Sequence, residues 1–142
     1  MTRKQPGKPG EQSDVVYVLP TVLSFTVPGE PVAWQRAGVS RTGRHYTRPA
    51  TRAFEAKVRT MAQHAAERVG WSPTRDDRYA VTLRVYRTHE SKGGDVDNYA
   101  KAVCDAMNGI AYQDDRYVRR LEVVVERDAK TPRVEVMVEA AA

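Results

Sequence analysis

The sequence predicts an α+β fold: one mixed β-sheet with two helices packed on it, in a single small domain. Three observations support this prediction. Several segments alternate apolar and polar residues with the period of half-buried strands, and two segments have the apolar spacing of amphipathic helices. No internal repeat or linker divides the 142 residues, and a hydrophobic content of 41% is enough for one core.

The first part of the chain, residues 1–14, combines prolines, glycines and charges with almost no apolar side chains. We therefore expect a disordered N-terminal arm there, followed by a folded domain over residues 15–142. Arg3, Lys4 and Lys8 leave two interpretations of the arm open. It is a solubilising tail, which we prefer because sparse basic arms are common, or it contacts nucleic acid.

The first regular elements are a strand and a long helix. Val22 to Val27 reads as a strand that ends at a proline-glycine turn. From Pro49 to Val69 apolar residues recur at helical spacing. Thr47 stands near the start of this segment, and Gly70 stands just past its end. These residues are typical of helix boundaries, so we predict a helix over 49–69.

Four further elements follow. Arg78 to Thr88 alternates like a half-buried strand, and a shorter helix is predicted from about Asp97 to Asn108, with Gly109 as its left-handed cap. Two more alternating segments, 117–126 and 133–139, are separated by a short polar stretch that contains a proline. This arrangement predicts an antiparallel hairpin.

Composition narrows the class of function. The formal net charge is +5 and the sequence pI is ≈ 9.5, so we expect an affinity for polyanions, with nucleic acid as the first candidate partner. No apolar run approaches the roughly 20 residues of a membrane span. Cys104 is the only cysteine, which excludes an internal disulfide, and no secretory signal opens the chain. We expect a cytoplasmic protein.

Five aspartates surround one lysine between residues 95 and 115 of this basic chain. They are Asp95, Asp97, Asp105, Asp114 and Asp115, around Lys101. Carboxylates held close together repel one another, so a fold tolerates such a cluster when a cation or a shared proton offsets the repulsion. Mg²⁺ prefers oxygen ligands and serves phosphoryl chemistry. The run therefore predicts a Mg²⁺ site that acts on a phosphate.

Local geometry indicates how the cluster would form. In an extended segment Asp95 and Asp97 point to one side and present two carboxylates together. Once a helix begins, Asp97, Lys101 and Asp105 share one face because they are four residues apart. The lysine there is suited to offset repulsion, contact a phosphate or stabilise charge in the transition state. The adjacent aspartate pair after the helix lies in a loop that can fold back to complete the site.

Each acidic residue also has an ordinary structural interpretation. Asp97 alone is equally well explained as the N-cap of the helix. Lys101 and Asp105 alone would be a surface ion pair, worth about 0.3 to 0.5 kcal/mol. Asp114-Asp115 alone would be a solvated turn. Only the combination of these residues favours a metal site.

The chain resembles the RusA-type Holliday junction resolvases of bacteria and their phages, from about Phe25 to Glu139. The resemblance rests on one ordered pattern: Asp95-x-Asp97-Asn98-x-x-Lys101-x-x-x-Asp105-x-Met107-Asn108-Gly109, followed by Asp114-Asp115. It implies a small homodimeric endonuclease that requires Mg²⁺, with Mn²⁺ as a substitute. Such an enzyme places symmetric nicks across a four-way DNA junction and leaves a 5′-phosphate and a 3′-hydroxyl, in DNA recombination and repair.

The same resemblance assigns roles to particular residues. The essential acids of the family match Asp95, Asp97 and Asp115, which would be both catalytic residues and metal ligands. The essential lysine of the family matches Lys101. Asp105 and Asp114 also match the family pattern. Asp114 is a further candidate metal ligand, and no role is assigned to Asp105. The resemblance places the protein in the cytoplasm of a bacterial cell or a phage-infected host.

Basic residues gather after the first strand, with aromatic side chains among them. The candidate DNA contacts are Arg36, Arg41, Arg44, Arg48 and Lys92. A solvated basic face is the alternative, but the separation of basic from acidic residues favours phosphate contact. Trp34 and Gln35 stand where the family often carries Lys or Gly, so this chain differs from the family pattern there.

Other reactive side chains have structural interpretations. His45, His64 and His89 do not have the spacing of a metal site. Cys104 is on the apolar side of the second predicted helix, which predicts a small core residue and not a nucleophile. The function predicted from the sequence is thus a Mg²⁺-dependent Holliday junction resolvase. The alternatives are a phage nuclease for flaps, forks or other branched DNA, and a catalytically silent junction-binding protein.

Overall fold

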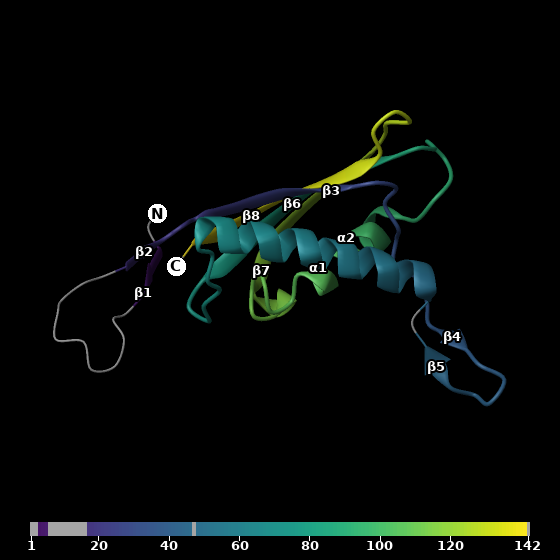
Figure 1. Cartoon of the computed structure of the whole chain (residues 1–142), viewed down its shortest axis with the longest axis horizontal. Helices are drawn as coiled ribbons and strands as arrows, with labels where there is room; N and C mark the ends of the chain where they lie inside the picture. The colour runs from purple at the N-terminus through teal and green to yellow at the C-terminus, as the bar shows by residue number, and fades with distance from the viewer. Residues whose placement is uncertain (1–2, 6–16, 47, 142) are drawn as a thin grey trace.

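A four-stranded mixed sheet with helices packed on it forms the body of the protein in the computed structural model, which describes residues 3–5, 17–46 and 48–141 (Figure 1). This arrangement confirms the predicted α+β fold. The strand order is β3-β8-β6-β7, from β3 (Val22–Pro28) through β8 (Arg133–Ala141) and β6 (Arg78–Arg87) to β7 (Val118–Arg127). The helices are α1 (Pro49–Val69), α2 (Val96–Ala106) and the short 3-10 helix η1 (Asp115–Tyr117).

Two small strand pairs lie outside this sheet. The first joins β1 (Arg3–Gln5) to β2 (Tyr17–Leu19), and the second joins β4 (Gly38–Val39) to β5 (His45–Tyr46). Residues 3–5 belong to the segment expected to be disordered, and here they are paired as a strand. The rest of that expected arm, apart from these three positions, lies outside the described residues. No helix in the described ranges has the length and apolar character needed to cross a membrane.

Helix α1 has the bounds that its sequence pattern predicts. Phe54, Val58 and Ala62 are buried at helical spacing, so one face of the helix packs on the sheet. The helix ends because Gly70 adopts a left-handed conformation with φ 70°, and its N–H bonds the carbonyl of Ala66. Arg48 occupies the N-cap without a side-chain cap, and the Thr47 of the prediction lies outside the described residues.

Helix α2 differs from its prediction at both ends. Asp95 is the N-cap residue, in extended conformation, and Asp97 lies in the first turn. The interpretation of Asp97 as the N-cap is therefore wrong. The C-cap is Met107 in a right-handed conformation, and not Gly109. Gly109 has φ 82° in the next turn, where its N–H donates to the carbonyl of Tyr112 at 2.8 Å.

The predicted hairpin between the last two strands is wrong, because β6 lies between them. β6 pairs with β7 in parallel and with β8 in antiparallel fashion, so that Leu83 has Val123 on one side and Val136 on the other. The alternation of apolar residues predicts strands but not their partners. The turn after β7 is bound to the end of β6 instead, since the N–H of Asp128 donates to the carbonyl of Arg87 at 2.8 Å.

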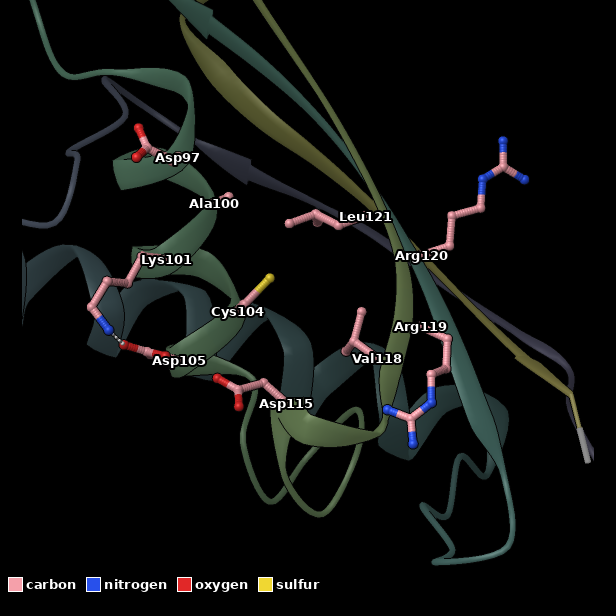
Figure 2. Close-up of a pocket in the computed structure, with 10 residues that line it drawn as sticks. All are labelled: Asp97, Ala100, Lys101, Cys104, Asp105, Asp115, Val118, Arg119, Arg120 and Leu121. Carbon is pink, nitrogen blue, oxygen red and sulfur yellow. Dashed lines mark hydrogen bonds and ion pairs between the residues drawn. The ribbon is translucent and has the colours of Figure 1, made fainter.

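The crossover from β6 to β7 positions the candidate site. Two parallel neighbours need a crossover connection, and α2 supplies it here. α2 packs against both α1 and β7, on the face of the sheet where Val81, Leu83 and Val85 are buried. As a result, α2 lies beside the outermost strand of the sheet, with Ala100 and Cys104 pointing toward that strand (Figure 2).

Candidate active site at the edge of the sheet

A cavity of ≈ 450 Å³ opens between α2, η1 and the first half of β7. Figure 2 shows the acidic side chains along α2 and η1, with Val118 and Leu121 of β7 pointing toward the helix. The charged residues that line it are Asp97, Lys101, Asp105, Asp115, Arg119 and Arg120. The acidic run of the sequence therefore contributes four charged side chains to one cavity, above a partly apolar floor.

Three of these side chains follow one another along α2, as the spacing of four residues predicts. Lys101 Nζ lies 3.1 Å from Asp105 Oδ2, and Asp97 lines the same cavity one turn before the lysine. The lysine has a second neighbour, because its Nζ lies 5.1 Å from the centre of the Trp34 ring. Carboxylate and indole together hold the amine at the cavity. The Lys101–Asp105 ion pair is real, but it is also part of a larger cluster.

Asp115 enters the cavity from η1 and meets Asp105. Burial raises the pKa of Asp115, and the neighbouring Asp105 raises it further by repulsion and by favouring a shared proton; Asp114 adds to the effect. The two carboxyl groups therefore compete for a proton or a cation. This is the environment that the sequence predicted for at least part of the acidic run.

Glu55 on α1 is a neighbour of the site that the sequence did not indicate. Burial and the negative charge of Asp105 raise the pKa of Glu55, while Lys101 lowers it. Glu55 is half-buried and belongs to a different helix from the other two residues. Its position depends on how α1 packs on α2, for which the sequence carries no local pattern.

Two predicted ligands lie elsewhere. Asp95 lines a neighbouring cavity of ≈ 660 Å³, together with Trp34 and Arg36. Asp114 turns back to cap η1, because its Oδ1 accepts a hydrogen bond from the N–H of Arg116 at 2.9 Å. The prediction that Asp95 and Asp97 present their carboxylates together assumed an extended chain, whereas the helix begins between them.

The carboxylate oxygens of the aspartates in the cavity are the type of ligand that a hard divalent ion prefers. Within the ranges that the structure describes, no three His, Cys, Asp or Glu side chains are close enough to form a metal site, so the expected cluster of Asp95, Asp97 and Asp115 is not assembled. Mg²⁺ commonly takes only one or two protein carboxylates and completes its shell with water and phosphate. The oxygen donors of Asp115 and Asp105, whose mutual repulsion raises a pKa, fit that requirement.

Cys104 forms part of the apolar floor. It is 8% exposed, and burial raises the pKa of its thiol to about 11. The thiol is therefore protonated at neutral pH and is a poor nucleophile. Its burial confirms the prediction of a small core residue.

The predicted DNA contacts border this region on an exposed surface. Arg41 and Arg44 lie in the segment of β4 and β5 that projects beyond the start of α1 (Figure 1). Arg48 is at the base of this projection, where its Nε donates to the carbonyl of Arg36 at 3.4 Å. Lys92 is exposed in the loop that precedes α2. All five side chains are accessible to a large polyanion.

Two comparisons with known proteins found similar sequences. The family model described as "Endodeoxyribonuclease RusA" matches residues 28–139 of the chain. The chain is also 35% identical, over 140 residues, to the "Uncharacterized protein YqaN" of Bacillus subtilis (strain 168), an alignment that covers 82% of this chain and 94% of that protein. The matched family range contains α1, α2, β6, β7, most of β8 and every residue that lines the acidic cavity, whereas β3 lies before it except for Pro28.

Proposed function

Since this chain belongs to the RusA endodeoxyribonuclease family, we propose that it is a Mg²⁺-dependent endonuclease that resolves four-way DNA junctions by paired symmetric nicks. One observation supports this proposal most directly. Asp97, Lys101 and Asp115 line a single cavity that opens at the edge of the sheet. Hydrolysis of a phosphodiester needs this combination of carboxylates and a cation.

The carboxylates of Asp115 and the neighbouring Asp105 would hold the metal ion in this proposal, and Asp97, which lines the same cavity, is a proposed ligand on the family pattern. A bound Mg²⁺ supplies electrostatic stabilisation of the phosphoryl charge and a water nucleophile at neutral pH. Asp95 remains a proposed ligand on the family pattern, although it lines the neighbouring cavity. Asp114, which caps η1, is the weakest of the proposed ligands.

Lys101 would donate from Nζ to a non-bridging oxygen of the scissile phosphate. Asp105 and Trp34 position that amine before DNA arrives, because one binds it at 3.1 Å and the other packs over it. A fixed donor is most effective where charge increases in the transition state. The expected products carry a 5′-phosphate and a 3′-hydroxyl.

DNA would also contact the projection formed by β4 and β5. Its exposed Arg41 and Arg44, with Arg36, Arg48 and Lys92 nearby, would bind phosphates and make affinity depend on salt. Two nicks related by two-fold symmetry need two active sites related in the same way, so we also propose a homodimer. The site of action would be the cytoplasm of a bacterial or phage-infected cell, in DNA recombination and repair.

A substrate panel tests the proposed function. A labelled mobile four-way junction is compared with matched duplex, fork and flap DNA, in Mg²⁺, in Mn²⁺ and in a chelator. We expect paired symmetric nicks on the junction with either metal and none in the chelator. Asp97→Asn is the inactive variant, and Asp76→Asn, at an exposed aspartate that does not line the cavity, is the matched control.

The alternatives predict different results on this panel. Faster cleavage of flaps or forks than of the junction would identify a nuclease for other branched DNA. Junction binding without cleavage in any metal would identify a catalytically silent binding protein. Asp95→Asn decides the role of Asp95, because a loss of cleavage as large as that of Asp97→Asn would place both carboxylates at the reacting phosphate.

A further inference from the structure

A second cavity, of ≈ 660 Å³, lies next to the acidic cavity and is open to the surface. We call it the Trp34 cavity. Residues 31–36, which follow β3, form one wall, and the other wall is formed by residues 93–95 together with Asn98 and Tyr99 at the start of α2. Ligand sites in proteins have volumes of about 300–1,000 Å³, so this cavity has room for a small organic group.

Contacts between the two walls fix the shape of the Trp34 cavity. The N–H of Trp34 donates to the carbonyl of Asn98 at 2.9 Å, and the N–H of Gly94 donates to the hydroxyl of Tyr99 at 3.2 Å. Gly94 also approaches the first wall so closely that a Cβ placed on it would lie 2.0 Å from the Cβ of Ala33. The cavity therefore exists before a ligand arrives, which reduces the entropy that binding must cost.

The side chains of the first wall offer three kinds of contact. Trp34 contributes a half-buried aromatic ring, and Gln35 contributes an exposed amide that can both donate and accept hydrogen bonds. Arg36 is exposed beside them and carries a positive charge. An unstacked nucleobase is bound by this combination: a ring packs against the base, an amide pairs with its edge, and a cation binds the phosphate.

The ring of Trp34 connects this cavity to the acidic one. Lys101, which lines the acidic cavity, has its Nζ 5.1 Å from the centre of that ring. In the proposed function the same amine contacts the scissile phosphate. A base is attached to the sugar beside its phosphate, so a base that leaves the stack at the cut site is within reach of the Trp34 cavity.

DNA at a four-way junction is suited to supply such a base. Strand exchange interrupts the stack at the centre of the junction, and unstacking costs least for a base that has already lost a neighbour or partner. A metal ion fits the Trp34 cavity less well, because Asp95 is the one acidic side chain among the residues that line it. The favoured occupant is therefore a base and not a cation.

We propose that the Trp34 cavity binds one unstacked nucleobase of the strand that is cut, next to the scissile phosphate. The ring of Trp34 packs against the base, and the amide of Gln35 pairs with its edge. The affinity of the protein for a junction then depends on the base at that position. This inference rests on the proposed function for the identity of the ligand, and it adds a site that selects where the DNA is cut.

Abasic scanning tests the contact with the base. A nucleotide that lacks its base is placed at one position at a time in a four-way junction that cannot migrate, and binding is measured in a chelator. We expect one position, beside the nick mapped in Mg²⁺, at which the missing base weakens binding about tenfold. Trp34→Leu should bind the intact and abasic junctions within about twofold of each other, because the ring is gone. Trp34→Phe, which keeps a ring, should retain most of the difference, and circular dichroism confirms that both variants are folded.

Base exchange tests the contact with the amide. Four junctions that differ only in the base pair at that position are compared in the same binding assay. The wild type should bind the best and the worst of them about fivefold apart or more, and Gln35→Ala should reduce this spread to within about twofold. Gln63→Ala is the matched control, since this exposed glutamine of α1 lines neither cavity, and it should keep the wild-type spread.

Three results would overturn the proposal: abasic nucleotides that weaken binding equally or not at all at every position, a position-specific loss that is unchanged in Trp34→Leu, or a spread of affinities that is unchanged in Gln35→Ala. Paired nicks without any position-specific loss would overturn this inference alone. A protein that shows the position-specific loss and cuts no junction in either metal would instead overturn the proposed function and leave the base site standing.

Discussion

β7 runs between two turns that contain aspartates, and the carboxyl groups at its two ends have opposite environments. At the start, burial and the neighbouring Asp105 raise the pKa of Asp115. At the end, the N–H of Thr131 and the guanidinium of Arg133 lower the pKa of Asp128. The residue type is the same at both ends, so the difference arises entirely from what surrounds each carboxylate.

The comparison separates a structural aspartate from a candidate functional one. Asp128 accepts hydrogen bonds from the N–H groups of Lys130 and Thr131 at 3.1 and 3.0 Å, and Arg133 lies 2.9 Å away. Its charge is balanced within its own turn. Asp115 faces the carboxyl group of Asp105, and such a pair of neighbouring carboxyl groups is characteristic of sites that bind a cation or move a proton.

Replacing the two aspartates in turn gives the largest expected difference. Asp115→Asn should lower the rate of junction cleavage about 100-fold or more, because it removes a proposed metal ligand, and it should leave junction binding intact. Asp128→Asn should keep the rate within about threefold of the wild type. Cleavage and gel-shift assays on one junction measure both effects. Equal loss of rate in both variants would end the distinction between the two turns.

Two lysines extend the comparison: Lys101, which binds Asp105, and Lys130, in the turn of Asp128. Lys101→Ala should lower the single-turnover rate about 10- to 100-fold and change junction affinity little, since its amine acts on charge that develops in the transition state. Lys130→Ala, in the turn that holds Asp128, is the matched control and should cleave normally. A Lys101 variant with weakened binding and a normal rate would return this lysine to the role of a surface ion pair.

Metal-dependent stability gives a smaller effect that is independent of catalysis. Saturating Mg²⁺ should raise the melting temperature of the wild type by about 2–5 °C, because the ion binds the folded state and relieves the repulsion at Asp115. Asp128→Asn should retain this increase, and Asp115→Asn should lose most of it. Differential scanning fluorimetry with Mg²⁺ and with a chelator measures the shift. An undiminished increase in Asp115→Asn would remove this carboxylate from the metal site.

The smallest expected effect is the pH dependence of the turn at Asp128. A lowered pKa in the folded state means that the ionised carboxylate stabilises the fold. That contribution is complete above the ordinary aspartate pKa of about 3.9 and is lost as the pH falls through the lowered folded value. Asp128→Asn should therefore melt about 1 °C below the wild type at about pH 6, and the two should converge near pH 2. If the difference in melting temperature between the variant and the wild type were unchanged near pH 2, the effect would come from the shape of the side chain and not from its charge.

The sequence predicted most reliably what depends on neighbours along the chain. The bounds of α1 follow from its apolar spacing and from Gly70, and the alignment of Lys101 with Asp105 follows from helical geometry. The misassigned positions depend on where a helix begins. The grouping of Asp95 with Asp97 assumes an extended segment. Helix α2 begins at Val96 instead, and Asp95 lines the neighbouring cavity.

Features that depend on packing between distant segments could not be predicted. The placement of Glu55 beside Asp105 requires knowledge of how two helices cross. The pairing of β6 with both β7 and β8 likewise cannot be predicted from the alternation of apolar and polar residues. Each strand has the same alternating pattern whichever neighbour it pairs with.

The position of β8 has a consequence for biosynthesis. Although β8 follows every other described element along the chain, it occupies an interior place in the sheet, between β3 and β6. A ribosome-bound chain that has emerged only as far as residue 132 holds β3 and β6 with no strand to join them. Sheet closure must therefore wait for β8 to leave the exit tunnel, and a nascent chain stalled before that point would expose to chaperones and proteases the edges of β3 and β6 that pair with β8.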